Sequence, residues 1–426
     1  MATKVTYINF NDTMHAKYDN LYFINNDFYY LTIEKNTILK GVITFGGPKL
    51  SKEDTTMCPK IIYFPDMEKL TSYVKSLDCV KLKKPTLYFT HFFQHNIAHG
   101  LFDALYPIYL CYLRFFGNDD FKKLNLLITL LEVNGWKMPA NYIPCRDWVL
   151  NVFKDFTLKG STLFKNNIDK KYNIKFSTLL AGNYKLGLSV VNEKFEMYGK
   201  ELFALENFRN RFFKAYNIVK KDHGEKINII VLNNDNRYSY TEKNELKKIL
   251  NYFSKKENVN IDFIDWKNIP IFKNQLELIN KYDIHISGCG TNMFNFPFLN
   301  DNSIHINLGS SNYNNVYRKP SLMETNIFPL SNTIYCDQYD IYKHKSIKYE
   351  EVKNLIEKNI ENFKNKTKLV YKIPKYVEKW QLFCKKFPNK AKEIIKQAIG
   401  EKSPNMVNYR FPDTIMHYYP NIYNNI

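Results

Sequence analysis

The sequence predicts an α/β protein with two domains. Its 426 residues exceed the length at which a single hydrophobic core stops growing. The content of 45% hydrophobic and 16% aromatic residues is sufficient for two cores and argues against a disordered chain. In the second half, short apolar runs alternate with helical patterns, which is typical of parallel strands joined by crossover helices.

The first half begins with strand patterns. Residues 20–33, NLYFINNDFYYLTI, place an Asn-Asn pair between two aromatic runs and predict a hairpin. Residues 85–93 predict a buried strand, and a helix of about 20 residues follows it from near Asn96 to Gly117. Further on we expect a strand at 123–131 and a helix at 192–216.

The second half has a more regular pattern after a charged linker, KKDHGEK, at 220–226. Strands alternate with helices there, so we expect a Rossmann-like domain with a parallel sheet. The expected strands are 227–234, 259–266, 283–290 and 303–309, and the expected helices are 241–256 and 274–282, followed by late helices at 350–366 and 375–387.

The net charge is +19, and it comes almost entirely from lysine, because only seven of the 61 basic residues are arginine. Nucleic-acid-binding proteins usually rely on arginine for bidentate contacts, and here the lysines are dispersed along the chain. This pattern favours a solvated surface with weak attraction to anionic substrates or membranes. A basic nucleic-acid-binding protein is the less favoured alternative, and we expect no specific nucleic-acid partner.

The seven cysteines include no Cys-x-x-Cys pair, which favours reduced thiols over a disulfide framework or a zinc site. The first residues, MATKVTYINF, carry no apolar signal region, and no run of about 18 apolar residues occurs. These features predict a soluble, cytoplasmic protein without a transmembrane segment, with at most weak peripheral attachment to membranes.

Three polar residues lie within the apolar run that follows the 85–93 strand. On a helix, Asn96, His99 and Asp103 occupy positions i, i+3 and i+7 and share one face. The Asp103 carboxylate could hold one imidazole N–H of His99 and so raise the basicity of the other nitrogen. This arrangement suits a general base that acts on an alcohol. A buried polar network with a purely structural role is the alternative.

A second pattern overlaps the first, because His91, His95, His99 and Asp103 are spaced four residues apart and could form a metal-binding face. The 85–93 strand would break this helical register. The chain also contains no two aspartates separated by a single residue, the pair that commonly holds a metal-bound sugar nucleotide. We therefore expect no metal.

Two segments in the second half could bind phosphate. The turn SGCGTNMFNFP at 287–297 joins a strand to a helix, and exposed N–H groups in such a turn attract anions. Arg237 follows the carboxyl end of the 227–234 strand, where doubly wound sheets bind ligands. An ordinary loop and a surface arginine are the alternatives.

Taken together, these segments resemble glycosyltransferase family 61. Members of this family carry an Asn-x-x-His-x-x-x-Asp helix, matched here by Asn96, His99 and Asp103. They next carry a strand-to-helix segment similar to 227–246, which retains Arg237 and Glu245-Leu246, and then a strand, turn and Phe-Leu-Pro segment similar to 283–309. Three blocks in the expected order cover about residues 85–310.

The resemblance implies a GT-B-like architecture, with two Rossmann-like domains facing across a cleft and C-terminal helices crossing back. It implies an acceptor-side α/β domain at 1–220, a nucleotide-sugar-binding domain at 221–345, and crossover helices with an aromatic tail at 346–426. Self-association into a homo-oligomer stays open.

The implied activity is inverting transfer of a sugar from a nucleotide sugar, most commonly a UDP-sugar, to a hydroxyl of a glycan or protein acceptor. His99 would be the base, oriented by Asp103, with Asn96 positioning; Asp103 itself is the second candidate for the base. No metal or other cofactor would be needed, because protein groups would neutralise the departing diphosphate. The implied donor-binding residues are Arg237, Gly290, Thr291, Asn292, Asn295 and Asn307.

The sequence departs from the family pattern at three places on the donor side. Cys289 stands where the turn histidine is usual, Asn233 or Asp235 stands where a first arginine is usual, and Asn307 stands where a glutamate is usual. A nucleotide-sugar-binding protein without transfer activity would account for these departures and is the main alternative.

Overall fold

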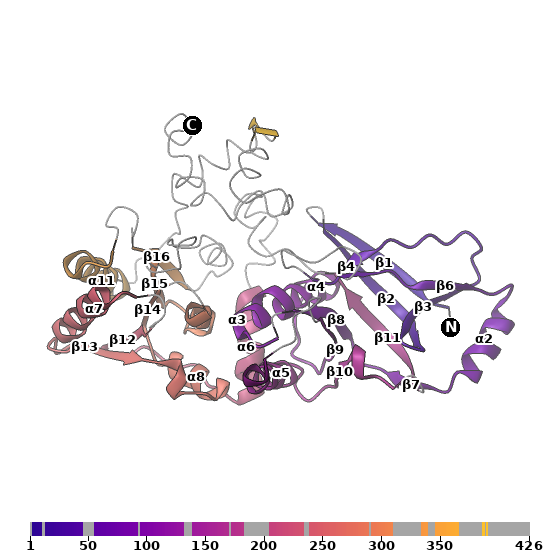
Figure 1. Ribbon diagram of the computed structural model, residues 1–426, viewed down its shortest axis with the longest axis horizontal. Helices are drawn as coiled ribbons and strands as arrows, with labels where there is room; N and C mark the ends of the chain where they lie inside the picture. Colours follow the sequence, from indigo (N-terminus) through magenta and orange to yellow (C-terminus); the bar gives the residue numbers. More distant parts are fainter. Residues whose placement is uncertain are drawn as a thin grey trace. The chain divides into compact units, whose positions relative to one another are not determined.

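The computed structural model describes residues 2–10, 13–45, 55–92, 94–131, 139–169, 172–182, 204–233, 238–288, 291–309, 334–339, 346–365, 386–387 and 389–390. The chain divides into two compact units, one formed by Met1–Leu186 with Asn210–Ala215 and the other by Gly187–Arg209 with Tyr216–Ile426. Each unit has its own sheet (Figure 1). The α/β class predicted from the sequence is confirmed, whereas the domain boundaries at 220 and 345 stay predictions.

The first unit contains a nine-stranded mixed sheet in the order β10-β9-β8-β11-β2-β3-β6, with β1 paired to β2 and β7 paired to β11. Strands β8, β9 and β10 run parallel, whereas β1, β2 and β3 form an antiparallel meander. The strands are β1 Lys4–Phe10, β2 Thr13–Ile24, β3 Asp27–Thr32, β6 Lys60–Tyr63, β7 Cys79–Leu82, β8 Thr86–His91, β9 Asn125–Leu130, β10 Thr162–Phe164 and β11 Asn173–Ala181, and a separate pair is formed by β4 Val42–Ile43 and β5 Thr56–Met57.

The predicted hairpin is confirmed as the β2–β3 connection. Ile24 pairs with Asp27, and the two residues between them, Asn25 and Asn26, have positive φ angles of 50° and 69°. Two consecutive left-handed residues form the type I′ turn whose twist matches that of the strands, and asparagine tolerates this conformation well.

Helices α4 and α5 belong to the parallel half of this sheet, since the chain runs β8, helix, β9, α5, β10. The helices of the unit are α2 Met67–Ser76, α3 Ile97–His99, the π-helix η1 Gly100–Leu105, α4 Tyr106–Phe116, and α5 Ile143–Phe156, with short 3₁₀ turns η2 Ala140–Tyr142 and η3 Lys165–Asn167.

The helix predicted after the 85–93 strand is confirmed as the consecutive elements α3, η1 and α4. It begins after Asn96 and ends at Gly117, which has a left-handed φ of 80°. Every residue from Tyr106 to Leu113 is buried. The stretch from Tyr106 to Leu113 is therefore a core element, whereas Asn96 and His99 at the start of the helix are partly exposed.

The second unit contains a five-stranded sheet in which every strand pair is parallel, in the order β13-β12-β14-β15-β16. Its strands are β12 Ile227–Leu232, β13 Val259–Ile264, β14 Ile284–Gly288, β15 Ile304–Gly309 and β16 Tyr335–Gln338. The predicted parallel sheet is thus confirmed. Because β13 lies on one side of β12 and β14 on the other, the direction of strand addition reverses at β12, as in doubly wound folds.

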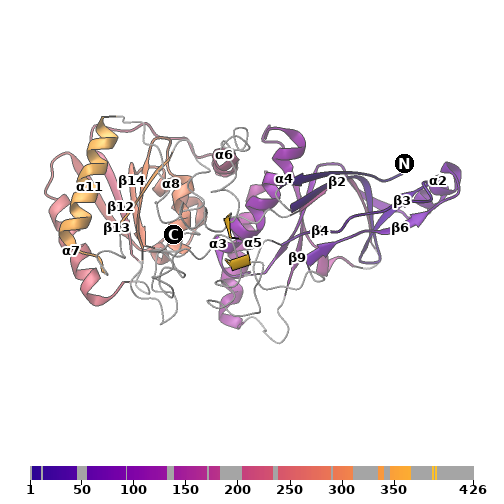
Figure 2. The ribbon, with the colours of Figure 1, turned by 90° about the horizontal axis from the view of Figure 1, so that it is seen from above.

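Helices cover both faces of this sheet: α7 and α11 lie on one face and α8 on the other (Figure 2). They span α7 Tyr240–Phe253, α8 Phe272–Ile279 and α11 Tyr349–Lys364, together with the 3₁₀ turns η4 Trp266–Asn268 and η5 Thr291–Phe298. Ser239 and Glu242 form a capping box that begins α7.

Helix α11 corrects one expectation. The resemblance implies that the late helices cross back to the first domain, but Val352, Ile356 and Ile360 of α11 pack into the core of the second unit. Their spacing of four residues forms one apolar stripe, which the aliphatic face of the parallel sheet covers. Most of the other predicted late helix, 375–387, lies outside the described residues.

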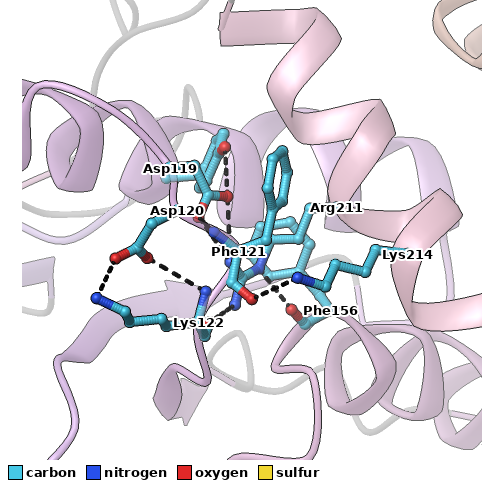
Figure 3. A network of polar contacts seen from close by, with 8 residues as sticks. Asp119, Asp120, Phe121, Lys122, Phe156, Arg211 and Lys214 are labelled. Carbon is cyan, nitrogen blue, oxygen red and sulfur yellow. Dashed lines mark hydrogen bonds and ion pairs between the residues drawn. The ribbon is translucent and has the colours of Figure 1, made fainter.

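Helix α6, Ala204–Tyr216, carries a fully buried ion pair of the first unit. The Arg211 guanidinium donates to both carboxylate oxygens of Asp119 at 3.0 and 3.1 Å and to the carbonyl oxygens of Phe156 and Lys122 at 2.7 Å each (Figure 3). The Tyr109 hydroxyl also donates to Asp119, at 2.8 Å. The network satisfies both charges within the protein.

The linker predicted at 220–226 is held to the second unit by polar contacts. Lys220 pairs with Asp301 at 2.7 Å, and His223 Nδ1 lies 2.5 Å from a carboxylate oxygen of Asp283. Hydrogen bonding to Asp283 raises the pKa of His223, whereas the partial burial of the ring lowers it by a smaller amount.

Within the described part of the chain, no helix is both long enough and apolar enough to span a membrane.

Candidate functional site

Asn96 caps the helix that carries the candidate base. Its side-chain oxygen accepts hydrogen bonds from the backbone N–H groups of Ala98 at 3.0 Å and His99 at 3.4 Å. Asparagine is among the preferred residues at this position because it satisfies N–H groups that have no partner within the helix. The observed contacts therefore assign Asn96 a structural role, and its predicted role in substrate positioning stays a prediction.

The segment directly after His99 winds as a π-helix. Gly100–Leu105 forms η1, and the N–H of Tyr106 donates to the carbonyl oxygen of Leu101, five residues earlier. Such single π turns are rare and occur often at functional sites. The backbone of Asp103 lies in this turn, about one turn after His99, whereas its side chain is outside the described residues, so the His99–Asp103 pair stays a prediction.

The sequence did not indicate the π turn, but it contains one residue that allows close packing there. A Cβ atom on Gly100 would lie 2.9 Å from Val149 Cγ1 and 3.1 Å from Phe153 Cζ, both on α5. Because Val149 and Phe153 are fully buried and cannot easily move, glycine permits the first turn of the helix to approach α5 closely.

His95 and His99 are both half-buried near the start of this helix. Burial lowers the pKa of His95, and the electrostatic effect of the neighbouring His99 lowers it further. The His95 ring also packs against Tyr142, with centroids 4.5 Å apart and planes tilted by 34°. His95 therefore remains a neutral aromatic neighbour of the candidate base at pH 7.

His91 does not extend this group. It is the last residue of β8, is buried, and packs edge-on against Phe153 with ring centroids 5.2 Å apart. The strand ends before the helix begins, so the four-residue register that a metal-binding face would need is broken, as expected from the sequence. Among the described residues no cluster of three or more His, Cys, Asp or Glu has metal-binding geometry.

On the second unit, the strands that precede the predicted donor-binding segments are neighbours. Strands β12 and β14 pair directly, with Val231 opposite Ile286. Their carboxyl ends lead to Asn233, which donates to Asp265 at 3.2 Å, and to η5. Carboxyl ends at the point where strand order reverses are the usual ligand-binding location in such sheets.

The individual donor-site residues are only partly described. Arg237 and Gly290 lie outside the described residues, and Thr291 and Asn292 are described only as backbone of η5. The predicted helix after the turn is this 3₁₀ segment, which contains Pro297. Asn295 is buried, and Asn307 is fully buried within β15. Their donor contacts stay predictions.

Strands β14 and β15 carry a buried polar row that was not predicted from the sequence. His285 pairs in register with His305, and Ser287 pairs with Asn307; all four side chains have no exposed surface. The two Nδ1 atoms of the histidines lie 2.6 Å apart, and Phe296 of η5 stacks on His305 at a centroid distance of 5.1 Å. The signal was the repeated alternation Ile-His-Ile-Ser and Ile-His-Ile-Asn.

Burial determines the protonation of this histidine pair. It lowers the pKa of His285 to about 3. Burial also lowers the pKa of His305, and the neighbouring His285 charge adds to this effect. These lowered pKa values keep both rings neutral at pH 7. Because an Nδ1-to-Nδ1 hydrogen bond between neutral rings needs one donor and one acceptor, the two rings have opposite tautomers.

No protein-family model matches this chain, and no curated protein matches it. The resemblance stated from the sequence therefore stays a prediction, and the function is argued from the residues of each unit.

Proposed function

We propose that this protein is an inverting glycosyltransferase that moves a sugar from a nucleotide-sugar donor, with UDP-sugars as the expected class, to a hydroxyl of a glycan or protein acceptor. The observation that carries the proposal is the parallel sheet of the second unit. Its strand order reverses at β12, and the ends of β12 and β14 lead into the segments that hold Arg237 and the 287–292 turn.

Inversion requires a single displacement at the anomeric carbon. An acceptor hydroxyl attacks, its proton passes to a base, and the nucleotide diphosphate leaves from the opposite face. We assign the base to His99, with Asp103 as the group that orients it. The π turn that follows His99 and the capped start of its helix support this assignment.

The leaving diphosphate carries negative charge that must be stabilised. We assign this role to the guanidinium of Arg237 and to backbone N–H groups at Gly290, Thr291 and Asn292. In the proposal Asn307 contacts the ribose, and Asn295 is a further donor-binding residue. The finer GT-B arrangement, the cytoplasmic location and independence from metal belong to the same proposal.

The experiment is a thermal-shift comparison of UDP with ADP and NAD, with and without EDTA. A ligand that binds only the folded state stabilises it by about 2.7 kcal/mol at 100 times its dissociation constant. We expect UDP to raise the melting temperature with or without EDTA, and the Arg237→Ala variant to lose most of this shift.

The matched control is Lys247→Ala, which removes a positive charge from the exposed face of α7. It should retain the UDP shift. Stabilisation by ADP or NAD but not by UDP would refute the proposed donor class.

A nucleotide-sugar-binding protein without transfer activity is the second candidate, and the departures at Cys289 and Asn307 favour it. It predicts the same UDP shift but no transfer and no donor hydrolysis.

A further inference from the structure

Residues 219–223, shortly after α6, are fastened to the connections that precede β14 and β15. The side-chain amide of Asn280 donates to the carbonyl oxygen of Val219 at 2.8 Å. The side-chain amide of Asn300 donates to the carbonyl oxygen of Lys221 at 2.7 Å. Both asparagines are almost fully buried, so their amide groups are fixed in place. This segment, which we call the strap, therefore has a defined position although it forms neither a helix nor a strand.

His223 fastens the end of the strap through both of its ring nitrogens. Nδ1 lies 2.5 Å from a carboxylate oxygen of Asp283, and Nε2 lies 2.8 Å from the carbonyl oxygen of Asp301. An ionised carboxylate and a backbone carbonyl only accept hydrogen bonds, so both ring nitrogens must donate. An imidazole donates from both nitrogens only when it is protonated. The two contacts therefore require the charged form of His223.

The partner carboxylate makes this charge important for the fold. Asp283 is buried, and its second oxygen accepts a hydrogen bond from the backbone N–H of Asn228 at 2.7 Å. A buried carboxylate needs hydrogen bonds and a compensating positive charge, because it has lost its water. Among the described residues, His223 is the only basic side chain within ion-pair distance of Asp283.

The other charged groups around His223 are compatible with a protonated ring. Asp222, the preceding residue, adds a further negative charge. Lys220 of the strap pairs with the carboxylate of Asp301 at 2.7 Å, and Arg209 pairs with the same carboxylate. The positive charges of these two side chains are therefore compensated.

The pKa of His223 agrees with this geometry. The hydrogen bond to Asp283 has the largest effect and raises the pKa above its usual value of 6.5, although partial burial of the ring lowers it. Phe363 of α11 packs edge-on against the imidazole at a centroid distance of 4.9 Å and carries no charge. The charged ring is thus favoured near neutral pH.

We propose that the strap is a pH-sensitive device, which a protonated His223 holds closed and a neutral His223 releases. A neutral imidazole donates to only one of its two acceptors, and its other nitrogen then faces an oxygen without a hydrogen between them. Because the pKa is raised in the folded state, the contact is complete below pH 6.5 and is lost as the pH rises through the folded-state pKa. The inference does not depend on the proposed glycosyltransferase activity.

The first measurement is the pKa of His223 in the full chain. The protein is labelled with ¹³C in its histidines and titrated by NMR, and the His223→Gln variant identifies the signal by its absence. We expect this imidazole to titrate above pH 6.5. A pKa at or below 6.5 would overturn the proposal.

The second measurement is limited proteolysis of the strap at about pH 6 and about pH 8.5. A protease of broad specificity is used, cleavage between residues 217 and 226 is mapped by mass spectrometry, and a synthetic peptide of the same residues corrects for the pH dependence of the protease. In the wild type, the corrected cleavage rate should rise by about threefold or more at the higher pH, because each pKa unit of stabilisation corresponds to about a tenfold change in the equilibrium.

Two variants show whether His223 causes the change. His223→Gln carries no charge at either pH, so its strap should be cleaved rapidly at both. Lys221→Ala is the matched control, because it removes an exposed positive charge from the strap and keeps the carbonyl oxygen that Asn300 holds. It should retain the pH dependence of the wild type.

Equal corrected rates for the wild type at the two pH values would overturn the proposal. The same result follows if His223→Gln keeps the wild-type pH dependence. Should His223→Gln fail to fold, the proteolysis of the wild type and of Lys221→Ala still decides, because both retain the imidazole.

Discussion

The residues around His99 stabilise the start of its helix and set the surroundings of the proposed base. Asn96 caps the helix, Gly100 permits its close approach to α5, and His95 presents a neutral ring next to His99. The spacing of Asn96 and His99 was readable from the sequence. The capping role of Asn96 was not assigned, because an asparagine before a helical run has the same signature whether it caps or binds.

The buried histidine pair leads to a pH-dependent prediction at the residue scale. His285 and His305 are neutral when folded, with pKa values held below 6.5, and they take up protons near pH 6.5 only when unfolded. The unfolded chain therefore binds more protons below that pH, and stability must fall as the pH falls. Each histidine should contribute a loss of about 1.4 kcal/mol per pH unit below 6.5.

The measurement is urea unfolding at pH 7.5, 6.5 and 5.5 for the wild type and for the double variant His285→Leu/His305→Leu. Because the variant cannot take up these two protons, its stability should depend less steeply on pH by that amount. Parallel pH profiles for the two proteins would show that the pair has no such effect.

At the element scale, the regular pieces could be predicted and the irregular ones could not. The Asn-Asn hairpin and the alternating strands and helices of the second unit follow from local chemistry that short sequence windows contain. No short sequence pattern indicates the π turn at Gly100–Leu105 or the close packing of Gly100 against α5. Helix α11 was assigned to the wrong unit, because an apolar stripe does not specify which core it joins.

Helix α6 carries an element-scale prediction. Asp119→Asn removes the carboxylate that neutralises the fully buried Arg211, and breaking a buried pair from one side costs about 3–5 kcal/mol. We expect a corresponding fall in unfolding free energy in urea.

Glu350→Gln is the control, since it breaks the Lys353–Glu350 pair on α11, in which the Glu350 carboxylate is solvent-exposed, and it should cost less than about 1 kcal/mol. If Asp119→Asn is no more destabilising than this control, the buried network does not anchor α6.

At the scale of the whole molecule, the chain combines two α/β units with different sheets. The first is mixed, with its parallel strands next to the capped helix, and the second is fully parallel with a reversal of strand order at β12. In the proposed function, the first unit carries the catalytic base and the second unit binds the nucleotide-sugar donor. The dispersed lysines set the net charge of +19 without marking either site.

The central claim is that His99 acts as the base, and single-turnover kinetics with the melting temperature recorded on the same samples tests it most directly. UDP-xylose, UDP-arabinose and UDP-N-acetylglucosamine serve as donors, and transfer or donor hydrolysis is measured for the wild type, His99→Ala and Asp103→Asn. Loss of a general base typically costs a factor of about 10²–10⁴ in rate. We predict a loss of this size in both variants with little change in melting temperature or UDP binding. A His99→Ala protein that melts early yet turns over donor at the normal rate per folded molecule would contradict the account.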